Sequence, residues 1–293
     1  MTTTSIDAPV GAQTTSRGNG RRQQPGSGHH TLAYLFLGVL VVYFLIPIWW
    51  LFVASTKTAA GLFNGSHGAL WFDQSFALIP NLKVLFTYND GIYLRWIANS
   101  LFYAVAGGVG ATVLAGYGFA KFRFRGREAL FWFVLGSVMV PTTALAVPTF
   151  LLFSKVGLTN SPLSIILPSA VSPFGVYLMR IYAEAAVPAE LIEAAQLDGA
   201  GELRIFRSIA LRLLAPGSVT VMIFAFVATW NNYFLPLIML SEPKWYPLTV
   251  GIRQLGTTGI LIGSLLAIAP MILAFVLLQR YWESGLAAGA VNR

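Results

Sequence analysis

Six apolar stretches without a charged residue constrain this chain more than any other feature of its sequence. Each is 24 to 29 residues long, whereas about 20 residues let a helix cross a hydrocarbon core of about 30 Å. The sequence therefore predicts an all-α, polytopic membrane protein with six transmembrane helices. We expect these helices near residues 32–54, 97–120, 129–153, 163–180, 216–240 and 256–279.

Composition also favours a membrane protein over a soluble one. Charged residues make up 10% of the chain and hydrophobic residues 56%, whereas an ordinary soluble domain has about 25% charged residues. The net charge of +8 would suit nucleic acid only if the bases formed one face of a soluble fold. They lie instead between the apolar stretches, so the expected partner is the lipid bilayer and not a nucleic acid. The absence of cysteine excludes thiolate catalysis and thiolate metal sites.

Basic residues predict the orientation of the chain in the bilayer. With the N-terminus in the cytoplasm, 13 of the 19 Lys and Arg residues fall on the cytoplasmic side, in agreement with the positive-inside rule. We therefore expect both termini in the cytoplasm. Residues 1–30 are polar and are predicted to form a disordered cytoplasmic tail, which precedes a transmembrane domain over residues 31–293.

Small residues recur at helical spacing in the predicted second span. Gly108, Thr112 and Gly116 lie four residues apart and therefore on one helix face. A Gly-rich cofactor loop needs a preceding strand, so the pattern predicts close packing between helices instead.

Residues 181–215, called here the charged loop, form the one long charged helical pattern in the sequence. Pro188 suits the first turn of a helix, and Glu193 follows near the positive end of the helix dipole. Gly199 occupies the position after the helix where a left-handed conformation is needed. A second helix is predicted from about Glu202. We expect two short helices joined by a tight bend on the cytoplasmic surface.

The first of these helices has features that suit contact with another protein. Ala194 and Ala195 leave a ridge of small residues that another backbone can approach, and Glu193 offers a carboxylate to a partner's Arg or Lys. An amphipathic loop that rests on lipid headgroups fits the pattern equally well.

The charged loop resembles the EAA loop of permease subunits of binding-protein-dependent ABC importers, and its spacing resembles the maltose-type carbohydrate branch. The matching residues are Glu193-Ala194-Ala195, Asp198-Gly199-Ala200, Ile209, Leu211 and Pro216. Residues 81–86, 99–100, 230–236 and 279–291 resemble further segments of that branch. The family usually has proline at the position of Arg212. This difference puts in doubt the bend that leads into the fifth span.

What the resemblance implies is a mechanical role for the charged loop. The loop would seat in a cleft of a cytoplasmic ATPase subunit, whose closure would move the spans between inward-open and outward-open states. The implied partners are a second, homologous permease subunit, two ATPase subunits and an extracytoplasmic solute-binding protein, in a prokaryotic inner membrane. The residues expected to carry ATPase coupling are Glu190, Glu193, Ala194, Ala195, Asp198, Gly199, Ala200 and Phe206.

The chain is not expected to be an enzyme. No lysine follows a glycine, so the sequence has no Gly-x-x-x-x-Gly-Lys phosphate loop. The predicted spans contain no cluster of Asp, Glu or His that would mark a catalytic centre. We therefore expect no cofactor or metal bound by this chain, with ATP and Mg²⁺ used by the ATPase subunits.

Neutral polar residues are the candidates for a solute pathway. Asn231, Asn232 and Tyr233, next to Trp230, lie in the predicted fifth span, and Thr142 is a weaker candidate in the third. Amides in a membrane need partners or water, and sugars are commonly held by neutral amides and aromatic faces. The alternative is that these amides hold neighbouring helices together.

These features and the resemblance predict the permease subunit of an ATP-driven ABC importer for a sugar or oligosaccharide. The alternative within the family is a glycerophosphate-type or other neutral solute, although a phosphorylated solute would favour a basic residue in the pathway. The alternative from another class is an ion-coupled secondary transporter. The absence of Asp, Glu and His from the predicted spans counts against it.

Overall fold

The structure is a computed structural model that describes residues 27–64, 68–107 and 110–290. The chain divides into two compact units, Met1–Pro47 and Ile48–Arg293. All secondary structure in the described residues is helical, which confirms the all-α prediction. Of the tail predicted over residues 1–30, residues 1–26 lie outside the described residues.

The described part of the first unit is the beginning of helix α1 (Ser27–Ser55). From Thr31 to Ser55 this helix is long and apolar enough to cross a membrane. It corresponds to the span predicted over residues 32–54.

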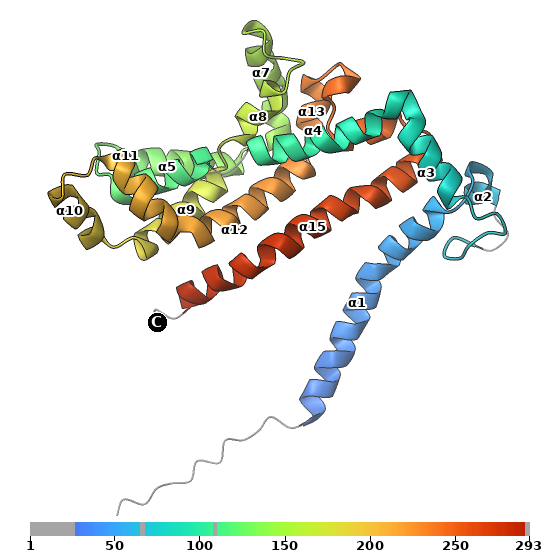
Figure 1. The fold of residues 1–293 in the computed structure, drawn as a ribbon, viewed down its shortest axis with the longest axis horizontal. Helices are drawn as coiled ribbons and strands as arrows, with labels where there is room; N and C mark the ends of the chain where they lie inside the picture. The colour runs from blue at the N-terminus through green and yellow to red at the C-terminus, as the bar shows by residue number, and fades with distance from the viewer. Residues whose placement is uncertain (1–26, 65–67, 108–109, 291–293) are drawn as a thin grey trace, which may run out of the picture. The chain divides into compact units, whose positions relative to one another are not determined.

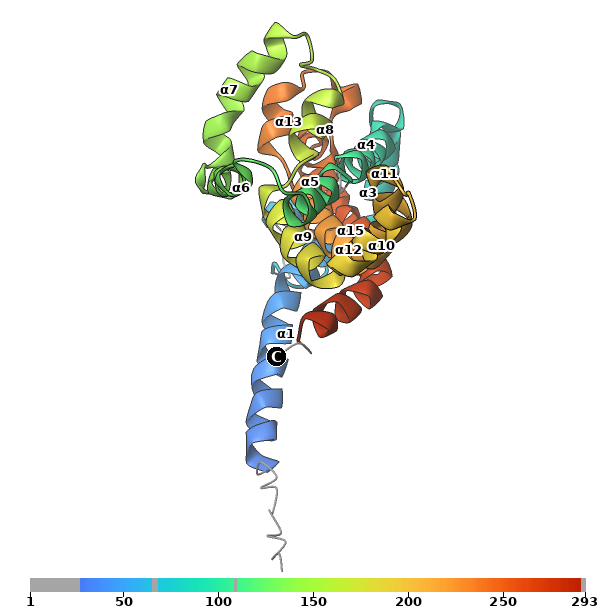
Figure 2. The same cartoon turned by 90° about the vertical axis from the view of Figure 1, so that its left-hand side faces the viewer.

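Helices α5 (Gly110–Lys121), α9 (Pro173–Ala186) and α12 (Leu211–Trp230) pack together at the centre of the second unit. Figure 1 shows α15 (Thr257–Ala290) and α4 (Ile92–Ala106) running beside α12. Figure 2 shows α9, α12 and α15 clustered when the unit is viewed along these helices.

Small residues bring α5 and α9 close together, and two members of the predicted pattern, Thr112 and Gly116, lie at this contact. Gly108, its third member, lies outside the described residues. A Cβ atom added to Gly116 would lie 3.0 Å from the carbonyl carbon of Met179, and one added to Gly175 would lie 2.7 Å from Cγ2 of Thr112. Both distances are shorter than ordinary contacts between carbon atoms. Glycine is therefore required at both positions for this helix packing.

Shorter helical elements connect and flank these helices. They are α2 (Ala59–Asn64), α3 (Leu78–Thr87), η1 (Tyr88–Gly91), η2 (Ser137–Met139), α8 (Leu163–Ser169), α10 (Ala189–Leu197), α11 (Glu202–Ile205), η3 (Phe206–Ala210), α13 (Phe234–Met239), η4 (Pro243–Trp245), α14 (Leu248–Gly251) and η5 (Ile252–Gln254).

Four helices in the described residues are long and apolar enough to cross a membrane, and two bent pairs raise that number to as many as six. The bent pair α8 and α9, which covers the span predicted over residues 163–180, turns by 41°. The upper number agrees with the six apolar stretches of the sequence.

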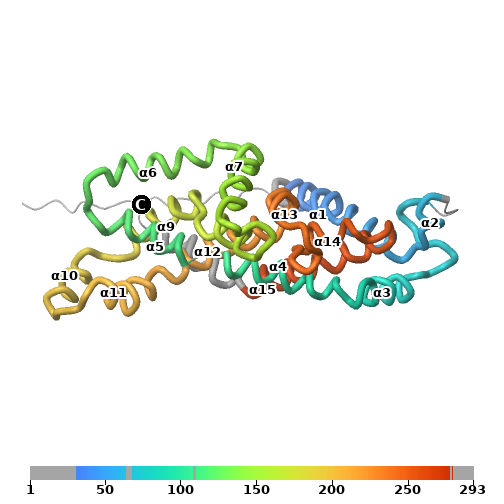
Figure 3. Tube along the Cα trace, turned by 90° about the horizontal axis from the view of Figure 1, so that it is seen from above, coloured from blue at the N-terminus to red at the C-terminus, as the bar shows by residue number. Residues whose placement is uncertain are grey.

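The single helix expected over residues 129–153 is instead two helices. The helical segment that starts with α6 (Arg127–Gly136) meets α7 (Thr142–Lys155) at 108°, and Figure 3 shows this turn. Pro141 lies at the bend. It has no N–H to continue the helix, and it holds Val140 extended, at φ −81° and ψ 121°.

The fifth span, expected over residues 216–240, also differs from its prediction. A helix continues from Glu202 to Trp230, and Arg212 lies inside it. The chain nevertheless changes direction between α11 and α12 (Figure 1), where the π-helical turn η3 (Phe206–Ala210) interrupts the α-helical pattern. After Trp230 the backbone leaves the helix over residues 231–233 before α13 begins.

Candidate functional site

Backbone hydrogen bonds at the end of α10 fix the bend of the charged loop. The amide of Ala200 donates to the carbonyl of Ala195 (2.9 Å), and the amide of Gly199 donates to that of Gln196 (3.0 Å). This pairing closes a helix through a left-handed residue. Gly199 has a φ of +77°, which confirms the conformation predicted for it.

The predicted coupling residues do not all reach the surface. Glu190, Glu193, Ala194, Asp198 and Gly199 are exposed. Ala200 and Phe206 are half-buried, and Ala195 is only 9% exposed. The expected ridge is therefore wrong at Ala195, because successive residues of a helix point about 100° apart.

Two leucines on either side of the bend in the charged loop were not among the predicted coupling residues. Leu197 is 89% exposed and Leu203 is 68% exposed. They add an apolar surface to the acidic one formed by Glu193 and Asp198. Periodicity alone did not reveal this surface, because an amphipathic pattern assigns leucine to the buried face.

The other side of the charged loop is attached to the packed helices. The ring of Phe206 lies 5.0 Å from that of Tyr117 on α5, centroid to centroid. The Lys121 ammonium, also on α5, donates a hydrogen bond to the carbonyl of Val187, whose side chain is fully buried. These two contacts attach the segments on either side of α10 to α5.

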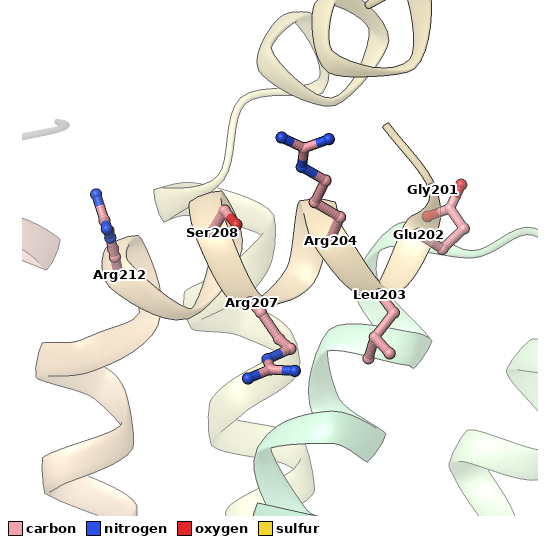
Figure 4. Close-up of a pocket in the computed structure, with 7 residues that line it drawn as sticks. All are labelled: Gly201, Glu202, Leu203, Arg204, Arg207, Ser208 and Arg212. Atoms are coloured by element: carbon pink, nitrogen blue, oxygen red, sulfur yellow. The ribbon is translucent and has the colours of Figure 1, made fainter. Parts of the chain in front are cut away.

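A basic groove of about 700 Å³ follows the chain from Gly201 to Arg212. Its cations are Arg204, Arg207 and Arg212. Figure 4 shows that Arg204 and Arg207 point to opposite sides of the helix. Because the guanidinium groups diverge, the groove does not assemble a site for a single anion.

A second hollow, called here the polar cavity, has a volume of about 660 Å³. This volume lies within the range of small-molecule sites. It is lined by α7, α8 and the break between α12 and α13. The lining residues are Thr142, Leu145, Ala146, Thr149, Pro168, Ser169, Ala228, Asn231, Asn232, Tyr233, Phe234 and Leu235.

Four of the five predicted pathway residues meet in the polar cavity: Thr142, Asn231, Asn232 and Tyr233. Trp230 is not among the lining residues. Its side chain is 5% exposed, and its ring stacks on that of Phe226 with centroids 5.7 Å apart. It belongs to the packing between helices.

The amides in the break stabilise the broken helix itself. The Asn231 side chain donates to the carbonyl of Val227 (2.9 Å), and the Asn232 side chain accepts from the amide of Leu235 (3.3 Å). Thr249 on α14 donates to the backbone carbonyl of Asn232 (2.8 Å). The side chains thus cap adjoining turns, and among the described residues their hydrogen bonds do not join neighbouring spans.

Asn160, which was not predicted, connects the loop after α7 to the loop after α13. Its side chain accepts from the amides of Ser241 (3.1 Å) and Glu242 (3.0 Å) and donates to the Glu242 carboxylate (2.6 Å). Hydrogen bonds from Lys244 and then from Asn160 lower the pKa of Glu242. Because α7 and α13 both border the polar cavity, this contact fixes two of its walls together.

The chain was compared with known proteins. The model of the family described as "binding-protein-dependent transport system inner membrane component" matches residues 107–287. The arabinooligosaccharides transport system permease protein of Halalkalibacterium halodurans is 32% identical over 271 residues, which cover 89% of this chain and 95% of that protein. The sn-glycerol-3-phosphate transport system permease protein of Brucella abortus (strain 2308) is 27% identical over 286 residues, covering 90% and 97%.

A solved structure has a similar fold. It is that of a bacterial ABC transporter involved in the import of the acidic polysaccharide alginate, and one of its chains superposes with a TM-score of 0.72 at 24% sequence identity. The match covers 87% of this chain and 96% of that chain. The arrangement of helices is therefore shared despite low identity.

Proposed function

Because this chain belongs to the binding-protein-dependent transport system inner membrane component family, we propose that it is the permease subunit of an ATP-driven ABC importer for a sugar or oligosaccharide. Members of this family are membrane subunits of transporters and not enzymes. The observation that carries the choice of solute is the polar cavity, whose lining is neutral throughout and includes hydroxyl, amide and aromatic groups.

Two further observations support a sugar over a glycerophosphate ester. The arabinooligosaccharide permease is more similar to this chain than the glycerol-3-phosphate permease, at 32% against 27% identity. A phosphate ester would also favour a cationic side chain in the cavity wall, and no Lys, Arg or His lines the cavity among the described residues.

The charged loop supports the proposed partners. Its exposed carboxylates and leucines suit a cleft on a cytoplasmic ATPase subunit, and its attachment to α5 suits the transfer of movement to the spans. We propose a complex with a second permease subunit, two ATPase subunits that use ATP and Mg²⁺, and an extracytoplasmic solute-binding protein. Both termini of this chain would lie in the cytoplasm.

Uptake by the complete importer in proteoliposomes tests this proposal. The expected result is ATP-dependent accumulation of at least one of radiolabelled lactose, maltotriose and arabinotriose, which a hydrolysis-deficient ATPase subunit abolishes. Uptake of glycerol 3-phosphate but of none of the sugars would contradict the sugar assignment. Accumulation driven by a proton or sodium gradient without ATPase subunits would contradict the importer assignment.

A further inference from the structure

The polar cavity contains two aromatic side chains in sequence, Tyr233 and Phe234, and their surroundings differ. The guanidinium carbon of Arg253 lies 5.4 Å from the centroid of the Tyr233 ring, within the range of a cation–π contact. Arg253 does not line the cavity, so it contacts this ring from outside. Among the described residues, no Lys or Arg side chain makes a cation–π contact with the ring of Phe234.

The segment that carries Arg253 also holds the backbone beside Tyr233. Thr249 precedes Arg253 by four residues in the consecutive helical turns α14 and η5, a spacing that places two side chains on one face. Thr249 bonds to the Asn232 carbonyl at 2.8 Å, and Arg253 contacts the ring of the next residue. The two contacts therefore support one short stretch of the cavity wall from behind.

This supporting segment is itself firmly anchored. The buried Ser100 hydroxyl on α4 accepts a hydrogen bond from the amide of Leu248 (2.7 Å). A Cβ atom added to Gly251 would lie 2.6 Å from ring atoms of Trp96, so the backbone of α14 rests directly on the indole. A side chain supported from such a segment keeps its orientation.

A fixed aromatic ring beside hydroxyl and amide groups suits a sugar ring. The C–H groups on one face of a pyranose or furanose carry partial positive charge, and the face of an aromatic ring carries partial negative charge. The sugar's hydroxyls remain free to bond to groups such as Thr142, Thr149 and Ser169, which line the same cavity. This recognition requires no charge to be desolvated.

We propose that Tyr233 is the stacking platform for one sugar ring in the translocation pathway, and that Arg253 is a positioning residue that holds this platform. The proposal rests on the proposed function and adds to it the residue that contacts the solute. It also separates Tyr233 from Phe234, although both line the cavity.

The test uses the complete importer in proteoliposomes and whichever of lactose, maltotriose and arabinotriose the wild type imports. Sugar uptake and ATP hydrolysis are measured together. Tyr233→Leu should lower sugar imported per ATP hydrolysed by about tenfold, with ATP hydrolysis within about twofold of wild type. Tyr233→Phe keeps the ring and should stay near wild type. Phe234→Leu, at the other aromatic residue of the cavity, should lower the ratio less than Tyr233→Leu does.

The role of Arg253 has its own readout. Arg253→Gln should lower the ratio by about threefold to fivefold, and Arg253→Lys, which keeps the cation, should restore most of it. In a Tyr233→Leu background, Arg253→Gln should have no further effect, because it acts through the ring. Arg95→Gln removes an exposed arginine over Trp245 (5.8 Å), outside the cavity, and controls for loss of a surface charge.

The outcomes distinguish the two proposals. If the wild type imports none of the three sugars, the proposed function fails, and the platform fails with it. If the wild type imports sugar and Tyr233→Leu matches it, or if Phe234→Leu is equally impaired, only the platform is overturned. Parallel losses of uptake and of ATP hydrolysis in Tyr233→Leu would indicate structural damage and would also overturn it.

Discussion

Single residues decide the geometry of both candidate regions, and the sequence revealed some of them. Asn231, Asn232, Tyr233 and Thr142 were predicted from their chemistry, and they meet in the polar cavity. Trp230 was predicted for its proximity in sequence and lies instead in the packing between helices. Ala195 was expected at the surface because it follows Ala194 in the motif, and it is buried. Adjacent residues of a helix face different directions, and short motifs carry no information about which direction is outward.

Gly199 is the residue on which the bend of the charged loop depends. Its φ of +77° costs a residue with a β-branched side chain about 1–2 kcal/mol, although space around it is open. Gly199→Val should therefore impair ATP-driven uptake in proteoliposomes while the complex still assembles. Gly201→Val is the matched control, because Gly201 has a φ of −73° and equally open surroundings. Equal uptake by both variants would contradict the role of the bend.

Gly116 sets the distance between α5 and α9. Gly116→Ala should lower the free energy of unfolding by about 1–3 kcal/mol, because the new methyl group overlaps the backbone of Met179. The change is measured as a fall in Tm of the purified complex in detergent. Gly118 lies on the same helix with no atom within 4 Å of its added Cβ. Gly118→Ala should leave Tm unchanged or raise it, and a fall as large as that of Gly116→Ala would refute the packing argument.

At the scale of elements, hydropathy predicted where helices occur better than where they break. The apolar stretches over residues 129–154 and 213–241 are each uninterrupted by charge, yet the structure bends the first by 108° and opens the second after Trp230. Neither break introduces a charged residue, so a hydropathy pattern does not reveal where the helix ends. Pro141 is the local signal for the first break. The second depends on amide caps and on Thr249, which come from tertiary contact.

The contact made by Asn160 joins the loop after α7 to the loop after α13 and is predicted to stabilise the fold around them. Asn160→Gly removes the three side-chain hydrogen bonds, and glycine adopts the φ of +54° found at this position without strain. Any fall in Tm would therefore come from the lost hydrogen bonds and not from backbone strain. We expect a lower Tm than wild type in detergent. Asn160→Ala should lower Tm further, because it adds strain. A wild-type Tm for Asn160→Gly would show that the contact contributes nothing.

The hydrogen bonds that Glu242 accepts from Lys244 and from Asn160 predict a dependence on pH. The folded protein lowers the pKa of Glu242 below its ordinary value of 4.5, so the stabilisation is present above that value and is lost as the pH falls through the lowered pKa. Wild-type Tm should therefore fall on acidification by more than the Tm of Glu242→Gln. Parallel curves for the two proteins would contradict this coupling.

For the whole molecule, the resemblance of the charged loop to a family motif identified more than any physical pattern did. The family model covers residues 107–287, and the fold match reaches a TM-score of 0.72 at 24% identity. Charge and periodicity alone left docking and lipid contact equally open for the loop. Physical arguments became decisive only for the location of side chains, such as Leu197, which is 89% exposed.

Assembly with the proposed ATPase subunits should depend on that leucine. Leu197→Asp should reduce co-purification of ATPase subunits without lowering the Tm of the permease pair, because an exposed side chain contributes little to folding. Leu70→Asp, which changes a leucine that is 50% exposed outside the charged loop, is the matched control. Normal co-purification with Leu197→Asp would show that this side chain does not contact the ATPase.

Helix α12 has 20 residues, from Leu211 to Trp230, and is therefore about 30 Å long at 1.5 Å per residue. It begins within the charged loop, and it ends next to Asn231, which lines the polar cavity. Such a helix can act as a lever: a tilt of roughly 5° about one end moves the far end by roughly 3 Å. A small rotation at the charged loop would thus change the width of the polar cavity by about the diameter of a water molecule.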